Sequence, residues 1–197
     1  VTDGAPTPDT ARIAPSDARQ YAAVQDHGYA IPGVDPDEIK PRNVRQLVKA
    51  PPGQQPGTIV VDPKNRYLYL VQENGQALRY GVGVGKAGME FSGTATVGYK
   101  RQWPSWRPTD AMIAREPKRY GPWAGGMAGG ETNPLGARAL YLFKDGKDTL
   151  YRIHGTNEPW SIGEAVSSGC IRMMNQDVID LYGRVPDGAK VVVLPVG

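Results

Sequence analysis

The stretch TIVVDPKNRYLYLVQENGQALRYGVGV, residues 58–84, alternates β-branched and aromatic residues with short polar segments. Three runs within it are typical of strands, namely residues 58–61, 67–72 and 77–84. The pair Asn74 and Gly75 lies between the last two runs, and Asn-Gly is a strong signal for a tight hairpin turn. The stretch therefore predicts short strands joined by tight turns.

Further strands are predicted downstream, at residues 94–100, 139–143, 149–154 and 189–194. The segment KDGK, residues 144–147, supplies the turn of a second hairpin. One helix is predicted over residues 175–185, where Asn175 can act as the cap and apolar residues recur at helical spacing. Strands and helices do not alternate regularly, which disfavours a doubly wound parallel sheet. We expect a mostly β fold, a sandwich or barrel with a few short helices.

The first 55 residues differ in composition from the rest of the chain. Residues 1–15 are rich in Pro, Thr, Asp and Ala and offer little to bury, so they favour a flexible lead-in. Short helices are predicted over residues 16–26, capped by Ser16, and over residues 43–49. The segment PPGQQPG, residues 51–57, breaks regular structure. We therefore place a partly helical extension and linker in residues 1–55 and the main domain in residues 56–197.

The bulk composition limits the classes of function. A chain of 197 residues, 40% apolar and 22% charged, suits one globular domain with an appendage. No run approaches the ~20 apolar residues that cross a bilayer. The net charge of +3 comes from scattered Lys and Arg, which disfavours nucleic-acid binding but permits attraction to a polyanionic substrate. Because the chain begins at Val1 without a signal-peptide pattern, we expect a processed or trimmed form.

Motifs for cofactors and metals are weak in this sequence. Three glycines match G-x-G-x-x-G after a predicted strand, namely Gly83, Gly85 and Gly88. No amphipathic helix follows to face a pyrophosphate, so we interpret these glycines as a tightly packed turn. The His and Cys residues are His27, His154 and Cys170, and they lack ligand-like spacing. We therefore expect no cofactor, no metal and no intramolecular disulfide.

His154 and Cys170 form the candidate catalytic pair. A thiol with its free pKa of ~8.5 is mostly protonated at neutral pH, so acyl transfer requires a nearby base to generate the thiolate. Arg172 could hold a substrate carboxylate through a bidentate contact. Small residues precede the cysteine, and their uncovered backbone N–H groups suit an oxyanion hole: Ser167, Ser168 and Gly169.

The alternative is that both side chains are structural. A lone Cys is among the most often buried residues, and a lone His at a strand end is commonly satisfied by hydrogen bonds. The string SSGCIRM, residues 167–173, argues against this alternative, because Ser, Ser and Gly give a core strand nothing to bury.

The segment HGTNEPWSIGEAVSSGCIRM, residues 154–173, resembles the signature of the L,D-transpeptidases, the YkuD-type catalytic domains of bacterial cell walls. The resemblance covers about residues 56–195 and includes PGTIVVDPKNRYLYLV, YGVGVGK, WPSWRPT and NPLGARALYL. It implies that Cys170 is the acylated nucleophile and His154 the base, with the Gly155 carbonyl orienting the imidazole in place of a carboxylate. The N–H groups of Gly169 and Cys170 would form the oxyanion hole. Some members carry a second histidine where this chain has Ser168, so that role does not transfer.

The resemblance also implies the reaction. Cys170 would attack the third-residue carbonyl of a peptidoglycan stem peptide and expel the terminal D-alanine, leaving a thioester. An amine would resolve the thioester, either from a second stem, giving a 3→3 cross-link, or from an outer-membrane protein or lipoprotein. Water would give L,D-carboxypeptidase activity. The implied protein is a monomer of the periplasm or cell envelope and a carbapenem target.

Two irregular segments are expected to wall the donor cleft as a loop or lid, namely WPSWRPT, residues 103–109, and the Gly-rich residues 121–140. Asn157, Trp160 and Met127 are further candidates for substrate contact, with ordinary packing as the alternative for the last two. Two other functions stay open. One is a catalytically silent module that binds wall peptides, and the other is a β-rich interaction domain with a structural cysteine.

Overall fold

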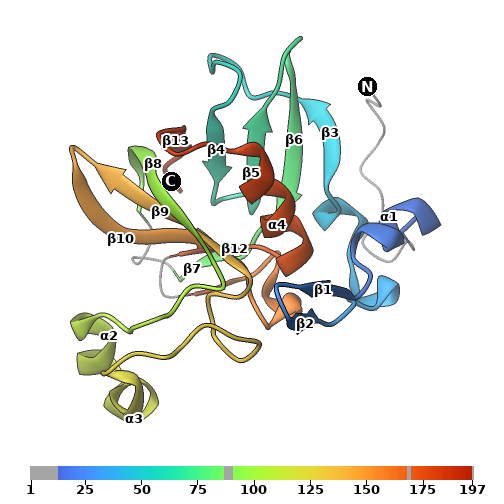
Figure 1. Cartoon of the computed structure of the whole chain (residues 1–197). Coiled ribbons are helices and arrows are strands. Elements are labelled where there is room, and N and C mark those ends of the chain that lie inside the picture. Colours follow the sequence, from blue (N-terminus) through green and yellow to red (C-terminus); the bar gives the residue numbers. More distant parts are fainter. Residues whose placement is uncertain (1–12, 87–90, 168–169, 197) are drawn as a thin grey trace.

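The computed structural model describes residues 13–86, 91–167 and 170–196. A mixed sheet of nine strands, ordered β12-β10-β9-β8-β13-β4-β5-β6-β3, forms the body of the fold (Figure 1). Its strands are β3 (Gln46–Lys49), β4 (Ile59–Asp62), β5 (Tyr67–Val71), β6 (Gln76–Gly81), β8 (Gly93–Gln102), β9 (Arg138–Lys144), β10 (Lys147–His154), β12 (Ile171–Arg172) and β13 (Lys190–Val193). The mostly β fold with few short helices predicted from the sequence is confirmed.

Smaller elements flank this sheet. Two short sheets pair β1 (Val24–Asp26) with β2 (Tyr29–Ile31) and β7 (Val84–Gly85) with β11 (Ala165–Ser167). The helices are α1 (Pro15–Gln20), α2 (Asp110–Arg115), α3 (Pro117–Tyr120) and α4 (Asn175–Arg184), with single 3-10 turns at Pro36–Glu38, Pro41–Asn43, Gly121–Trp123 and Pro159–Ser161. Among the described residues, no helix is both long and apolar enough to cross a membrane.

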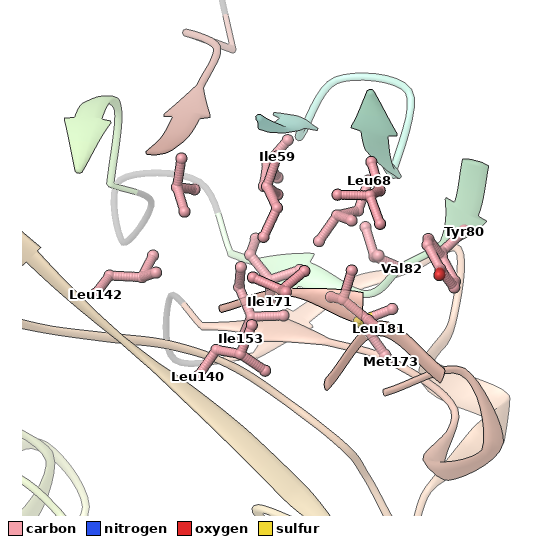
Figure 2. Packing of buried hydrophobic residues seen from close by; sticks show 14 of the residues in the cluster. Ile59, Leu68, Tyr80, Val82, Leu140, Leu142, Ile153, Ile171, Met173 and Leu181 are labelled. Atoms are coloured by element: carbon pink, nitrogen blue, oxygen red, sulfur yellow. The ribbon is translucent and has the colours of Figure 1, made fainter. Parts of the chain in front are cut away.

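The core lies between the curved sheet and α4 (Figure 2). Val178 and Leu181 on α4, with Val185 directly after the helix, form an apolar face that packs against strand residues such as Ile153 and Ile171. Each of these side chains is at most 7% exposed, and burying one contributes about 1.5–3 kcal/mol. The helical spacing read in residues 175–185 therefore reflects a real buried face. The strands that contribute Ile153 and Ile171 also carry the candidate site on their other face.

Both predicted hairpins are present. The β5–β6 turn places Asn74 at φ 61° and Gly75 at φ 71°, and the β9–β10 turn places Asp145 at φ 52° and Gly146 at φ 75°. Two consecutive left-handed residues are typical of the type I′ turn, whose twist matches that of antiparallel strands. These turns set the register that carries His154 to the end of β10.

The helices predicted in the N-terminal region are wrong beyond Gln20, and Ser16 does not cap α1, whose N-cap is Ala14. Residues Val24–Asp26 form β1, which turns through His27 and Gly28 and pairs with β2. Residues Gln46–Lys49 form β3, which pairs with β6 at the edge of the large sheet. Both segments are short, and a short apolar pattern is compatible with either a helix or a strand. The neighbouring strand decides between them, because its unpaired backbone groups can bond to the segment.

Two sets of hydrogen bonds attach the N-terminal segment to the rest of the protein. The Tyr21 hydroxyl donates to the Asp177 carboxylate at 3.1 Å and accepts the Arg45 N–H at 2.8 Å. Asp26 accepts hydrogen bonds from Trp103 at 2.8 Å and from Arg138 at 2.7 Å. The division at residue 56 stays a prediction, and residues on its N-terminal side contribute both the edge strand β3 and these contacts.

Candidate active site

Strand topology brings His154 and Cys170 to one end of the sheet. β10 and β12 are parallel neighbours, with Ile153 beside Ile171 and His154 beside Arg172. The two isoleucines point into the core (Figure 2), and side chains alternate along a strand, so His154 and Arg172 face away from it. Cys170 immediately precedes β12 and has the same parity as Arg172. The parallel pairing of β10 and β12 thus brings together two residues that are 16 positions apart in sequence.

His154 and Cys170 line the same cleft, which has a volume of about 870 Å³. The sheet side of the cleft also includes Arg152 and Tyr141. Its opposite wall comes from residues 105–135, which contain α2 and α3. The apolar members of that wall are Trp106, Met112, Tyr120, Trp123, Met127 and Leu135. The cleft is therefore a groove with the candidate nucleophile on one side and an aromatic wall on the other.

The imidazole of His154 is 5% exposed, and its Nδ1 lies 2.5 Å from the carbonyl oxygen of Gly155. Because a carbonyl oxygen only accepts hydrogen bonds, Nδ1 carries the proton and Nε2 is the basic nitrogen. Burial lowers the pKa of His154 from 6.5 to about 4. This net shift includes the hydrogen bond to Gly155, which raises the pKa, and the positive charges of Arg172 and Arg152, which lower it. His154 is therefore neutral at physiological pH.

Burial also raises the pKa of the Cys170 thiol above its ordinary value. The backbone N–H of Arg152 and the positive charges of Arg152 and Arg172 act in the opposite direction but do not overcome burial. Both members of the pair are therefore neutral in the ligand-free protein. Such a pair transfers its proton when a substrate carbonyl is already in place, because charge separation in a buried site is otherwise costly.

Gly155 and Asn175 fix the backbone behind the imidazole. The Asn175 Oδ1 accepts the N–H of Ala137 at 3.0 Å, and a Cβ on Gly155 would overlap that same oxygen. The prediction that Asn175 caps α4 is wrong, because Met174 holds the cap position and no side chain caps the helix. The side chain of Asn175, the first residue of α4, instead bonds to the residue directly before β9, so a tertiary contact replaces the local cap.

The arginines beside the pair are held by carboxylates. Arg172 contacts Glu158 at 2.9 Å, and Arg152 contacts Asp148 at 2.6 Å. The Arg152 guanidinium also lies 4.5 Å from the centroid of the Tyr141 ring. Arg152 was missed in the sequence, although alternation along a strand ending at His154 places it on the same face two residues earlier.

The other predicted site residues fall in different places. Ser167 lines the cleft, and its hydroxyl donates to the Cys170 carbonyl at 2.7 Å. Met127 also lines the cleft, whereas Asn157 and Trp160 are exposed and do not, with Trp160 65% exposed. Ser168 and Gly169 lie outside the described residues.

The glycine motif has a packing role where it is described. The N–H and carbonyl of Gly83 pair with the backbone of Arg172 at 2.8 and 2.9 Å, and a Cβ there would lie 2.7 Å from the Ser161 carbonyl oxygen. Gly85 lies in β7, and Gly88 lies outside the described residues. Over the part of the chain that the structure describes, no group of three or more His, Cys, Asp and Glu residues could hold a metal ion.

Comparison with known proteins identifies a matching family model and curated relatives. Residues 56–193 match the YkuD family model, described as the L,D-transpeptidase catalytic domain. The Escherichia coli K12 protein named probable L,D-transpeptidase YbiS is 32% identical over 167 residues, which are 82% of this chain and 53% of that protein. The chain thus spans about half the length of the curated relatives it matches.

Two solved structures share the fold. One is a Brucella melitensis protein described as a probable carnitine operon oxidoreductase, which is 56% identical with a TM-score of 0.55 and covers 79% of this chain and 96% of its own. The other is an L,D-transpeptidase from Mycobacterium smegmatis, 18% identical with a TM-score of 0.52, covering 70% and 58% of the two chains. The family model spans well over half of the sequence and includes His154 and Cys170. The chain therefore belongs to the YkuD family of L,D-transpeptidase catalytic domains.

Proposed function

We propose that the protein is a peptidoglycan L,D-transpeptidase whose nucleophile is Cys170 and whose general base is His154. The observation that carries the proposal is that both side chains line one cleft while the Gly155 carbonyl occupies His154 Nδ1. This arrangement reserves Nε2 for the proton of the nucleophile. A histidine with a purely structural role would not be expected to line a cleft that is large enough for a peptide.

In the first step the Cys170 sulfur attacks the third-residue carbonyl of a tetrapeptide stem, and its proton passes to His154 Nε2. The oxyanion of the tetrahedral intermediate accepts hydrogen bonds from the backbone N–H groups of Gly169 and Cys170. The C–N bond then breaks, and the leaving D-alanine amine takes the proton from Nε2. A thioester on Cys170 and a neutral imidazole remain.

In the second step an acceptor amine attacks the thioester carbonyl and His154 takes its proton. The C–S bond breaks, and the proton returns to the Cys170 sulfur. A second stem peptide as acceptor gives a 3→3 cross-link, and an outer-membrane protein or lipoprotein gives attachment. Water as acceptor gives L,D-carboxypeptidase activity through the same residues. The proposed chemistry uses no cofactor. Because peptidoglycan lies in the cell envelope, the proposal includes a periplasmic or envelope location, with the protein acting as a monomer.

The proposal predicts covalent capture by a carbapenem, because the β-lactam carbonyl replaces the donor carbonyl. Intact mass after incubation with a stoichiometric excess should show one adduct on the unchanged protein and none on Cys170→Ala. The His154→Gln variant should form the adduct at least ~100-fold more slowly, the usual contribution of general acid–base catalysis. Trp160→Ala, outside the cleft, is the matched control. Absence of an adduct on the unchanged protein, or its persistence on Cys170→Ala, would refute the assignment of the nucleophile.

The acceptor requires a second experiment. Cell walls treated with the protein and then digested should yield 3→3 cross-linked muropeptides by mass analysis if a stem is the acceptor. Tripeptide products alone would indicate the carboxypeptidase. Equal binding of wall fragments by the unchanged protein and Cys170→Ala, with no D-alanine released by either, would indicate a binding module instead.

A further inference from the structure

Arginines outnumber acidic residues in the lining of the cleft. Its described lining includes a single acidic residue, Asp110, and these arginines: Arg107, Arg115, Arg119, Arg152 and Arg172. A groove lined by one sign of charge between low-dielectric walls concentrates ligands of the opposite sign. The proposed chemistry at Cys170 uses a thiol and an imidazole, so it does not by itself account for the charge on the far wall.

The arginines fall into two groups by their environment. Arg152 and Arg172, on the sheet side, are 16% and 15% exposed and have carboxylate partners within 3 Å. Arg107 and Arg119, on the helical wall, are 66% and 60% exposed, and their partners lie at 3.9 and 3.7 Å. Exposed ion pairs at these distances contribute little, so a ligand carboxylate can replace them at low cost.

The third member of the wall, Arg115, has no carboxylate within 4.0 Å among the residues that the structure describes. Two of these three arginine side chains are nevertheless held by contacts with neighbouring residues. Arg107 Nε donates to the Ala124 carbonyl at 2.8 Å, and the Arg119 guanidinium lies 5.1 Å from the centroid of the Tyr120 ring. α2 and α3, which carry or adjoin all three arginines, lie next to each other at one end of the molecule (Figure 1).

We propose that Arg107, Arg115 and Arg119 form an anion-binding wall that recognises carboxylates of the donor peptide away from the reacting carbonyl. The inference rests on the proposed function and adds a substrate preference to it. Guanidinium groups bind carboxylates through paired, charge-assisted hydrogen bonds. The aromatic side chains Trp106 and Trp123 line the same wall and accommodate apolar parts of a peptide. The occupant is therefore a peptide that bears free carboxylates rather than carboxamides.

The experiment compares two synthetic donor tetrapeptides that both keep the terminal D-alanine carboxylate free. They differ only in their remaining carboxylates, which are free in one peptide and amidated in the other. D-Alanine release by the full chain gives kcat and KM for each peptide. The unchanged protein should show a KM at least about tenfold lower for the free carboxylates, the effect of one charge-assisted contact. The combined variant Arg107→Gln, Arg115→Gln, Arg119→Gln should lose this preference and keep the kcat for the amidated peptide. Raising the salt concentration should reduce the preference of the unchanged protein as well.

The matched control is Lys118→Gln, which removes a charge from α3 at an exposed position that does not line the cleft. It should leave the preference intact. Equal KM values for the two peptides with the unchanged protein would overturn the proposal of an anion-binding wall. A preference that survives in the combined variant would also overturn it, since Arg172 would then be the source of the preference. If neither peptide releases D-alanine while the protein stays folded, the proposed function itself fails. Formation of the carbapenem adduct by the combined variant shows that Cys170 is still reactive.

Discussion

His154 and Asp177 are both buried titratable side chains, yet His154 lines the cleft, whereas Asp177 lies on α4, contacts the N-terminal segment and is not part of the cleft lining. Burial is the largest cause of both pKa shifts. It lowers the pKa of His154 to about 4 and raises that of Asp177 from 3.8 to about 7. The directions are opposite because burial disfavours the charged form, which is the acid form of histidine and the base form of aspartate.

The partners of the two groups explain their different use. A single backbone carbonyl holds Nδ1 of His154 and leaves the other nitrogen for a substrate proton. The Tyr21 hydroxyl instead donates to both carboxylate oxygens of Asp177, and Tyr21 is itself fully buried. Similar burial thus has two different uses. In the cleft it leaves His154 as a proton acceptor, and outside the cleft it allows Asp177 to hold α4 against the N-terminal segment.

The largest effect is expected for Asp177→Asn, which mimics the neutral acid. The unfolded state loses its proton near pH 3.8, whereas the native state keeps it to about pH 7, so the stability of the unchanged protein falls as pH rises through this window. The variant should gain up to about 4 kcal/mol relative to the unchanged protein above pH 7 and nothing below pH 4. Denaturant unfolding at several pH values measures the difference. A constant difference across the window would contradict a buried charge at this position.

The next effect has the opposite sign with pH. Unfolded His154 binds a proton below about pH 6.5, whereas the native imidazole stays neutral to about pH 4, so stability falls as pH drops through this range. Replacing the residue in His154→Gln should remove about 3 kcal/mol of this acid-dependent loss. Between these limits the Asp177 and His154 contributions partly cancel in the unchanged protein, so only the two variants separate them. If His154→Gln and the unchanged protein lost stability in parallel, the neutral imidazole would be ruled out.

Much of the sheet could be predicted from sequence, because strands β4, β5 and β9 carry residues that are apolar on a buried face and are joined by turns with distinct chemistry. The sequence also singled out Cys170 and His154, which are rare residue types in a short segment, and both line one cleft. β1 and β3 could not, because each depends on a partner strand that local pattern does not reveal. The role of Asn175 was missed for the same reason. The helix α2 could have been found, since Thr109 accepts the Met112 N–H as its cap.

A smaller effect should follow from Gly155→Ala, which tests whether the imidazole is fixed from behind. The added Cβ would overlap Asn175 Oδ1, so the backbone at His154 must move. We expect a loss of about 2 kcal/mol in unfolding free energy, typical of an added methyl in a packed site, with slower carbapenem capture. Gly183→Ala is the control, because it lies in α4 with open space around its Cβ position and should be neutral or slightly stabilising. Equal stability of the two variants would show that the contact with Asn175 does not constrain His154.

The smallest effect is expected for Trp160→Ala. This variant tests whether a residue contacts substrate because it lines the cleft or because it is close to His154 in sequence. Trp160 is six residues from His154 but is 65% exposed and does not line the cleft. Because little surface is uncovered by its removal, unfolding free energy should change by no more than ~0.5 kcal/mol and carbapenem capture should be unchanged. Met127→Ala, far in sequence but within the cleft lining, should raise KM for the donor peptide. If Trp160→Ala raised KM and Met127→Ala did not, the peptide would run along the outer surface beside β10, and the cleft between the sheet and the helical wall would not be its path.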